Sequence, residues 1–369
     1  MSALLLSPPH RFWLLLSLCL LGFGLLYAVV RDAGRGARRR GLHKRIAAHG
    51  WPAAGTDEPA VGALRERMGK AQQSMRRAHW AKSASPVPWF LCLGDAAANL
   101  PGLFATTHGA RADAPSAPSS SDGEWWRWWL TPRLVAVEVD STAAGDTTGA
   151  PRSRGLWLQS LLALAERRDR LPLNGFVVAV AATDLLEAGT AKLKSQAERT
   201  RRLLDEASDT LRLQMPTYLV VTGLERLAGY ETLHGALPPE VLAQALGHRL
   251  TDPSAFIETP AGERLDAVFD PIAQQLHALR MALLREQPGS TGRLAIHEFV
   301  EAVRALRPGL REFAQVLFEN HGRNSRAPRW RGFYLTAAAS DAVGGAFVHD
   351  LFERFLPVDQ PLVRPGRPS

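Results

Sequence analysis

The sequence is poor in cysteine, with two among 369 residues. This number excludes a disulfide-bonded scaffold and a zinc or iron–sulfur centre built from several cysteines. The eleven histidines show no HExxH segment and no other paired ligand spacing, and no GxSxG segment is present. The sequence therefore predicts no metal site, no cofactor and no hydrolase nucleophile.

Acidic side chains are nearly absent between Arg31 and Arg45, where Asp32 is the single acid. The seven basic residues of this segment are Arg31, Arg35, Arg38, Arg39, Arg40, Lys44 and Arg45. Most of the formal charge of +8 lies here, and no comparable basic run follows. We therefore do not expect a nucleic-acid-binding face. A short basic cluster of this kind is typical of the cytoplasmic side of a membrane span.

Directly upstream, the run from Phe12 to Val30 (FWLLLSLCLLGFGLLYAVV) contains no charged residue. As a helix, its 19 residues span about 28 Å, close to the thickness of the hydrocarbon core of a bilayer. Arg11 alone precedes the run, so the positive-inside rule places the N-terminus outside and the long C-terminal part in the cytoplasm. A cleaved signal peptide is the alternative, but it needs its basic segment before the apolar run. We expect a single-pass anchor.

Composition divides the rest of the chain. Residues 1–11 form an N-terminal tail, and residues 31–85 are polar, basic and alanine-rich, which predicts a helical juxtamembrane stalk. Pro86 and Pro88 mark a boundary. Residues 357–369 are rich in proline and predict a disordered tail.

Short apolar runs alternate with helical patterns over residues 86–232. The strands expected there are Trp89–Gly94, Arg133–Asp140, Phe176–Ala181 and Tyr218–Val221. Because these runs are apolar on both faces, they predict a parallel sheet covered by helices on both sides. Residues 233–325 show a helical pattern only, and residues 326–356 supply a last strand and helix. The predicted fold class is α/β with a helical subdomain inserted before the last strand.

Four tryptophans, Trp125, Trp126, Trp128 and Trp129, lie before the second strand. We expect Trp128 and Trp129 to pack at the start of that strand. For Trp125 and Trp126, core packing and an interfacial or partner-binding patch both stay open.

The turn after the first strand, GDAAANLP from Gly94 to Pro101, departs from the phosphate-binding sequence GxxxxGK[ST]. Asn99 stands at the second glycine, Leu100 at the lysine and Pro101 at the hydroxyl residue. Leu100 has no charge to offer a phosphate, and Pro101 has neither a side-chain oxygen nor an N–H. Asp95 adds a carboxylate where a polyphosphate would lie. We expect this turn to bind no nucleotide.

Five segments, in this order, resemble the IcmF/TssM family, the inner-membrane component of bacterial type VI secretion systems. They are PWFLCLGDAAANLPGL (88–103), WWLTPRLVAVEV (128–139), RLPLNGFVVAVAATDLL (170–186), MPTYLVVTGLERLAGY (215–230) and RGFYLTAAAS (331–340). The resemblance covers residues 86–356 and implies a GTPase-like sheet of the P-loop NTPase type. Family members usually have several transmembrane helices and a large periplasmic region, so we expect a short version of the family.

The resemblance also assigns the remaining nucleotide positions, which depart from the family pattern. When the segment is aligned with the family pattern without gaps, Glu138 stands at the Walker-B-like aspartate and Ser141 at the switch glycine. If the alignment shifts by two residues, Asp140 takes the place of the aspartate instead. The guanine-recognition segment keeps Thr222 but has Gly223 for the lysine and Glu225 for the aspartate. Three degraded sites together predict a pseudo-GTPase that is not an enzyme.

By resemblance, we expect a non-catalytic assembly component at the cytoplasmic face of a type VI secretion complex in the bacterial inner membrane. The implied partners are an inner-membrane TssL-type protein and baseplate proteins such as a TssK-type protein, with self-association left open. Two alternatives stay open as well. One is a nucleotide-binding switch with an atypical loop, and the other is a membrane-anchored regulator unrelated to secretion.

Overall fold

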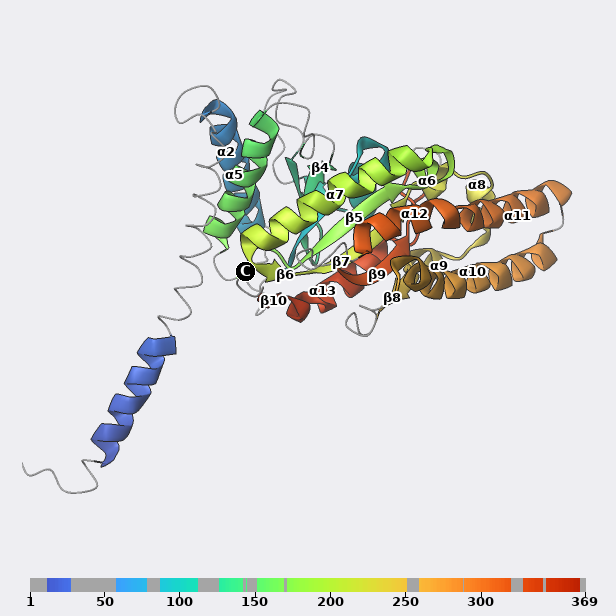
Figure 1. The fold of residues 1–369 in the computed structure, drawn as a ribbon. Coiled ribbons are helices and arrows are strands. Elements are labelled where there is room, and N and C mark those ends of the chain that lie inside the picture. Colours follow the sequence, from blue (N-terminus) through green and yellow to red (C-terminus); the bar gives the residue numbers. More distant parts are fainter. Residues whose placement is uncertain are drawn as a thin grey trace, which may run out of the picture.

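The structure is a computed structural model of the chain (Figure 1). It describes residues 12–27, 58–77, 87–111, 126–141, 144, 151–168, 171–250, 259–287, 289–319, 328–340 and 343–365. Residues 12–27 form a helix whose side chains are all exposed. Residues 28–30 and the basic segment 31–45 lie outside the described ranges. Within those ranges, no helix has both the length and the apolar character that a membrane span requires.

An eight-stranded sheet forms the core, in the order β2-β3-β4-β1-β5-β7-β9-β8. Five central strands are parallel, namely β4 (Val135–Asp140), β1 (Trp89–Gly94), β5 (Gly175–Ala181), β7 (Pro216–Thr222) and β9 (Arg329–Leu335). Antiparallel strands close both edges, namely β3 (Trp126–Leu130) with β2 (Ala110–Arg111) on one side and β8 (Leu246–Arg249) on the other. The prediction of an α/β fold with a mostly parallel sheet is confirmed.

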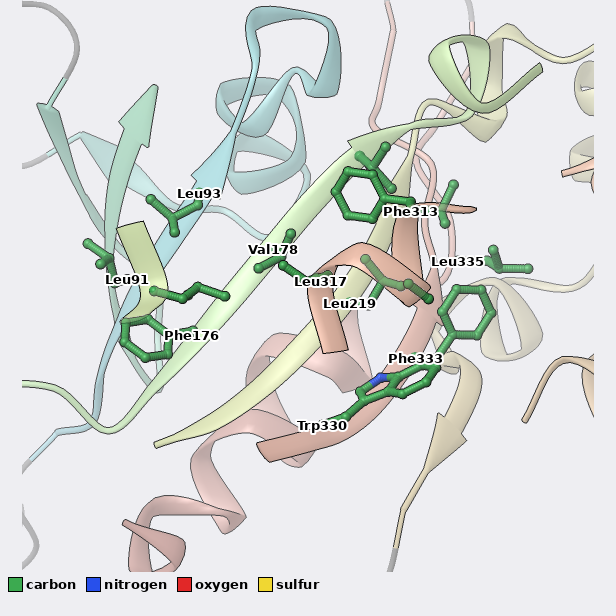
Figure 2. Packing of buried hydrophobic residues seen from close by; sticks show 14 of the residues in the cluster. Leu91, Leu93, Phe176, Val178, Leu219, Phe313, Leu317, Trp330, Phe333 and Leu335 are labelled. Atoms are coloured by element: carbon green, nitrogen blue, oxygen red, sulfur yellow. The ribbon is translucent and has the colours of Figure 1, made fainter. Parts of the chain in front are cut away.

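Successive side chains of each strand enter two separate apolar clusters on opposite faces of the sheet. Val178 of β5 belongs to the larger cluster, together with side chains from α5 (Pro151–Arg167), α7 (Thr190–Leu211) and α12 (Arg307–Phe318). Figure 2 shows Phe313 and Leu317 of α12 beside this face of the strands. Val177 belongs to the other cluster, with α3 (Leu100–Thr106) and the π-helix η4 (Leu351–Phe355). Both faces of the sheet are therefore covered.

The segment 233–325 departs from the expected helical pattern. It contains α8 (Tyr230–Ala236, which begins just before it), α9 (Pro239–Ala243), α10 (Ala261–Glu286), α11 (Ser290–Ala305) and α12, but also the edge strand β8. The prediction of helices alone was wrong because β8 is short and half-buried, and is held by backbone pairing with β9 rather than by an apolar pattern. Helices α10 and α11 form a hairpin at one end of the molecule (Figure 1).

The expected stalk includes a helix, α2 (Glu58–Arg77), but this helix packs on the folded domain. Met68 and Ala71 are buried, and α2 contacts α5 and β3. The tryptophans of β3 are buried as well. Trp126 packs on Trp157 of α5 with ring centroids 6.2 Å apart. Core packing therefore accounts for Trp126, Trp128 and Trp129, while Trp125 lies outside the described residues.

The expected disordered tail is structured as far as residue 365, so that prediction was wrong for residues 357–365. The chain continues through α13 (Leu356–Val358), η5 (Gln360–Leu362) and β10 (Arg364–Pro365), which pairs with β6 (Leu213–Gln214). Asp359 is 1% exposed and accepts hydrogen bonds from Tyr218 and Arg331 and one from Arg249. This buried carboxylate fixes a segment whose proline-rich composition alone indicates disorder.

Candidate functional site

The expected nucleotide positions lie at the carboxyl ends of the parallel strands. Gly94 ends β1 and is paired in register with Asp140, the last residue of β4. The helix after β1 covers one face of the sheet and α5, after β4, covers the other. Ligands of open α/β sheets bind in the crevice at such a switch point. The structure therefore brings the two positions together where a phosphate would bind.

Polar groups of the loop between β1 and α3 form hydrogen bonds within the loop and the first turn of α3. It runs from Gly94 through a 3₁₀ turn, η2 (Ala96–Ala98), to Asn99, which has a left-handed backbone conformation with φ 45°. The Oδ1 of Asn99 accepts from the N–H of Gly102 at 3.3 Å. Pro101 removes another N–H from the first turn of α3, a helix of only seven residues. Few N–H groups are left for an anion.

Apolar side chains fill the inside of the loop. Leu100, at the lysine position, is 2% exposed and belongs to the cluster on the α3 face. A Cβ at Gly94 would lie 3.2 Å from Ala98 and from Leu100, so the loop closes tightly over the strand. A charged side chain at position 100 would point into this apolar cluster rather than toward a ligand.

The mouth of the crevice is bridged by a carboxylate. Asp95 accepts a hydrogen bond from the hydroxyl of Ser141, the residue that follows β4. Its second oxygen lies 3.4 Å from Nη2 of Arg199 on α7. These contacts connect the loop after β1 to β4 and to α7, across the place where phosphates would lie.

The guanine-recognition segment is also bound within the chain. Thr222 is buried, and its hydroxyl donates to the carbonyl oxygen of Val180 at 3.4 Å. Gly223 has φ +84° and precedes η3 (Leu224–Arg226). The Oε2 of Glu225 accepts from the backbone N–H of Ala338, just after β9, at 3.0 Å. A base would have to compete with this N–H for the carboxylate.

Glu138 lies inside the sheet, away from the crevice. Its carboxylate accepts from Nη2 of Arg127 at 2.5 Å and from Nε1 of Trp129 at 2.6 Å, both on the neighbouring strand β3. The residue at the edge of the sheet is Asp140, which is paired in register with Gly94.

Cys92 of β1 is paired with Glu138 in the sheet. Burial raises the pKa of its thiol, and the carboxylate of Glu138 raises it further, so Cys92 is not an activated nucleophile.

Hollows on the described surface include one of about 500 Å³ and one of about 240 Å³. The larger is lined by side chains of α10, α11 and α12, and the smaller lies between α3, α9 and the segment before η4. Neither is lined by the loop from Gly94 to Pro101 or by Asp140 or Glu225. In the described part of the chain, no group of three metal-ligating side chains comes together.

Sequence reasoning missed Arg199 and Arg226 at this site. Arg199 contacts a residue 104 positions earlier, and Arg226 donates to the carbonyl oxygen of Ala97, 129 positions earlier. Both side chains lie on surface-facing turns of their elements and look like ordinary solvated cations in the sequence. Only the packing of α7 and η3 against the loop after β1 reveals their partners.

Comparisons with known proteins support the family that the sequence segments resemble. A family profile described as the IcmF-related N-terminal domain matches residues 150–344, more than half of the chain. The type VI secretion system component TssM1 of Pseudomonas aeruginosa is 25% identical over 296 residues, which cover 76% of this chain and 26% of that protein. The chain thus spans about a quarter of the length of this relative. No solved structure matches the chain. On the profile match and the shared segments, the chain belongs to the IcmF-related family.

Proposed function

We propose that this chain is a non-catalytic assembly component of a type VI secretion system, a pseudo-GTPase that acts through protein contacts. The observation that carries the proposal is the closed loop after β1, where Leu100 is buried and Asp95 bridges to Ser141 and Arg199. The name of the relative TssM1 supports the secretion role.

A nucleoside triphosphate would meet three obstacles at this loop. It would bring negative charge next to the carboxylate of Asp95, which repels it. It would have to separate Arg199 from that carboxylate and Arg226 from Ala97. It would also lack the charge-assisted contact of a lysine, which contributes several kcal/mol in a working loop. Each of these obstacles weakens the binding of a nucleoside triphosphate.

The proposed location is the cytoplasmic face of the bacterial inner membrane. The apolar run from Phe12 to Val30 supports a single-pass anchor, and the basic residues after it support a cytoplasmic domain. The exposed apolar side chains of the helix over residues 12–27 suit a lipid environment. The proposed partners are a TssL-type inner-membrane protein and a TssK-type baseplate protein.

Isothermal titration tests the loss of nucleotide binding. The full chain, purified in a neutral detergent, is titrated with GTP and with ATP in the presence of Mg²⁺ up to millimolar concentration. We expect no saturable heat and no change in unfolding temperature. Saturable binding of either nucleotide would instead establish a nucleotide switch with an atypical loop.

Co-purification tests the secretion role. The tagged full chain is produced together with the TssL-type and TssK-type proteins of the same bacterium, and stable complexes are isolated in detergent. We expect at least one of the two proteins to co-purify at a fixed ratio. If neither does, the chain is better explained as a membrane-anchored regulator unrelated to secretion.

A further inference from the structure

Arg168, directly after α5, is a half-buried cation at the amino end of the sheet. Its guanidinium carbon lies 4.8 Å from the ring centroid of Trp89, the first residue of β1. Its Nη1 donates to Oδ1 of Asn174 at 3.2 Å. Stacking on one face and one hydrogen bond hold the guanidinium in a defined place and leave further N–H groups along its edge.

The groups that hold Arg168 are themselves rigid. Asn174 is completely buried, and its Oδ1 also accepts from the backbone N–H of Trp89 at 2.8 Å. The backbone N–H of Asn174 donates to the carbonyl oxygen of Trp89 at 2.7 Å. The Nδ2 of Asn174 is buried and has no hydrogen-bond partner in the described part of the chain. At this end of β1 and β5, Arg168 and Asn174 therefore have more N–H groups than the described residues have acceptors for them.

Three of the four fully buried arginines in the described part of the chain pair with acids, and the fourth, Arg264, donates to the carbonyl oxygen of Phe318 at 2.9 Å. Arg331 pairs with Asp359 at 2.8 Å, Arg201 with Asp205 at 2.9 Å and Arg280 with Glu301 at 2.6 Å. Among the described residues, Arg168 has no carboxylate partner, and Asn174 is its one hydrogen-bond acceptor. It is therefore an exception to the rule that buried charges are paired.

The missing partner has a measurable consequence. Burial lowers the pKa of Arg168 to about 10, and no acid among the residues that the structure describes opposes this effect. Desolvation of an unpaired cation destabilises the fold, and an anion in contact with it would remove that penalty. An acceptor that lies in the plane of the guanidinium would complete its hydrogen bonds without disturbing the stacking on Trp89.

We propose that Arg168 binds a carboxylate supplied by an acidic segment of a partner protein. A carboxylate is planar, so it can pair with two guanidinium N–H groups while it lies parallel to the indole ring. A phosphate carries further charged oxygens out of that plane. Arginine is one of the residues enriched at the energetic centre of protein interfaces. The inference rests on the proposed function, because it assumes that the chain acts through protein contacts.

Thermal unfolding of the full chain in a neutral detergent tests the site, with acetate as the probe. Acetate replaces chloride at constant ionic strength, and unfolding is followed by tryptophan fluorescence. Arg168→Met keeps the apolar stem and removes the charge, and Arg167→Met at the exposed neighbour is the matched control. We expect acetate to raise the unfolding temperature of the wild type and of Arg167→Met by about 2 °C relative to Arg168→Met.

The same melts contain the outcomes that would overturn the site. In chloride, Arg168→Met should be at least as stable as the wild type, because the variant loses an unpaired charge. A clear loss of stability in chloride without any acetate response would show that Arg168 is a structural residue. A response to inorganic phosphate but not to acetate would also overturn the assignment to a protein carboxylate. None of these unfolding measurements involves a nucleotide or a secretion protein. A negative result would therefore overturn the carboxylate site at Arg168 without bearing on the proposed function.

Discussion

Nη2 of Arg226 donates to the backbone carbonyl oxygen of Ala97 at 2.8 Å, and this contact joins the guanine-recognition segment to the loop after β1. A phosphate-binding loop needs the opposite polarity, with backbone N–H groups pointed at the ligand. Here the loop presents an oxygen to a cation of its own chain. The contact therefore stabilises a conformation of the loop that does not need a ligand.

Restoring the lysine of the phosphate-binding sequence should damage the fold rather than restore the site. Leu100→Lys replaces a buried leucine and places an ammonium group in an apolar cluster. We expect a loss of at least about 3 kcal/mol in the free energy of unfolding. Urea unfolding of the full chain in detergent measures it, and titration with GTP should still give no saturable heat.

Leu100→Met is the control for that substitution, because it keeps an apolar side chain of similar volume. It should change the free energy of unfolding by less than about 1.5 kcal/mol. A stable Leu100→Lys protein that binds GTP would show that the loop can open, and it would contradict the interpretation of Leu100 as a core residue.

Glu225 should matter for stability through its hydrogen bond to Ala338. Ala338 is 3% exposed, so Glu225→Ala leaves a buried backbone N–H without its acceptor. We expect a loss of about 1–3 kcal/mol in urea unfolding. Glu225→Gln keeps a side-chain oxygen at the same place and should lose less than about 1 kcal/mol. Equal losses in the two variants would indicate that the charge, rather than the hydrogen bond, is what stabilises this turn.

The strands at the centre of the sheet could be predicted because each is a continuous apolar run. The run Phe176–Ala181, for example, is buried along its whole length, and Tyr218–Val221 likewise. Edge strands could not be found in this way. β8 is half-buried, and β3 contains Arg127, whose partner Glu138 lies on the adjacent strand. Such strands are defined by pairing with a neighbour that is distant in sequence.

The candidate site was predictable to the same degree. Gly94 ends a strand that the sequence predicts, and Leu100 begins the helix that follows it, so the place of this loop in the fold could be predicted. The role of Glu138 was not predictable, because a shift of two residues along β4 leaves the side chain on the same face and changes only its distance from the edge. The contacts of Asp95 depend on α7, whose position relative to the loop no local pattern encodes.

Tyr334 offers a test of pH dependence. Its hydroxyl is buried and has no hydrogen-bond partner within the ranges that the structure describes. Burial raises its pKa to about 12, against the opposing effect of Arg249 and Arg331. The folded state therefore favours the neutral phenol, and the unfolded chain ionises first, near pH 10. The stability contributed by the neutral form is complete below about pH 10 and is lost as the pH rises toward 12.

Tyr334→Phe removes this dependence and the unsatisfied hydroxyl together. At pH 7 we expect the variant to be at least as stable as the wild type in urea unfolding. Between pH 9 and pH 11, its advantage should grow by about 1 kcal/mol. Burial also raises the pKa of Tyr218, so part of the alkaline loss should persist in the variant. A parallel pH profile for the two proteins would contradict the assignment to Tyr334.

Gly229 connects the segment after β7, which contains Gly223 and Glu225, to the helical hairpin. It precedes α8, has φ +79°, and a Cβ at this position would lie 1.8 Å from the carbonyl oxygen of Ala295 on α11. The next residue, Tyr230, donates its hydroxyl to the carbonyl oxygen of Gly344 at 3.0 Å and lies 5.9 Å from the ring of Phe299. Gly229→Ala must therefore displace α11 as well as strain the backbone. We expect a loss of more than about 2 kcal/mol in the free energy of unfolding.

The matched control for Gly229→Ala is Gly235→Ala, within α8, where a Cβ would meet nothing within 4 Å. Alanine there should stabilise the chain by about 0.5–1 kcal/mol, because glycine is unfavourable inside a helix. Hydrogen exchange of the full chain in detergent separates the two effects. Amides of α10 and α11 should exchange faster in Gly229→Ala and at the wild-type rate in Gly235→Ala. Unchanged protection of α11 in Gly229→Ala would mean that the hairpin is positioned by its packing on α12, and that α8 does not fix its place.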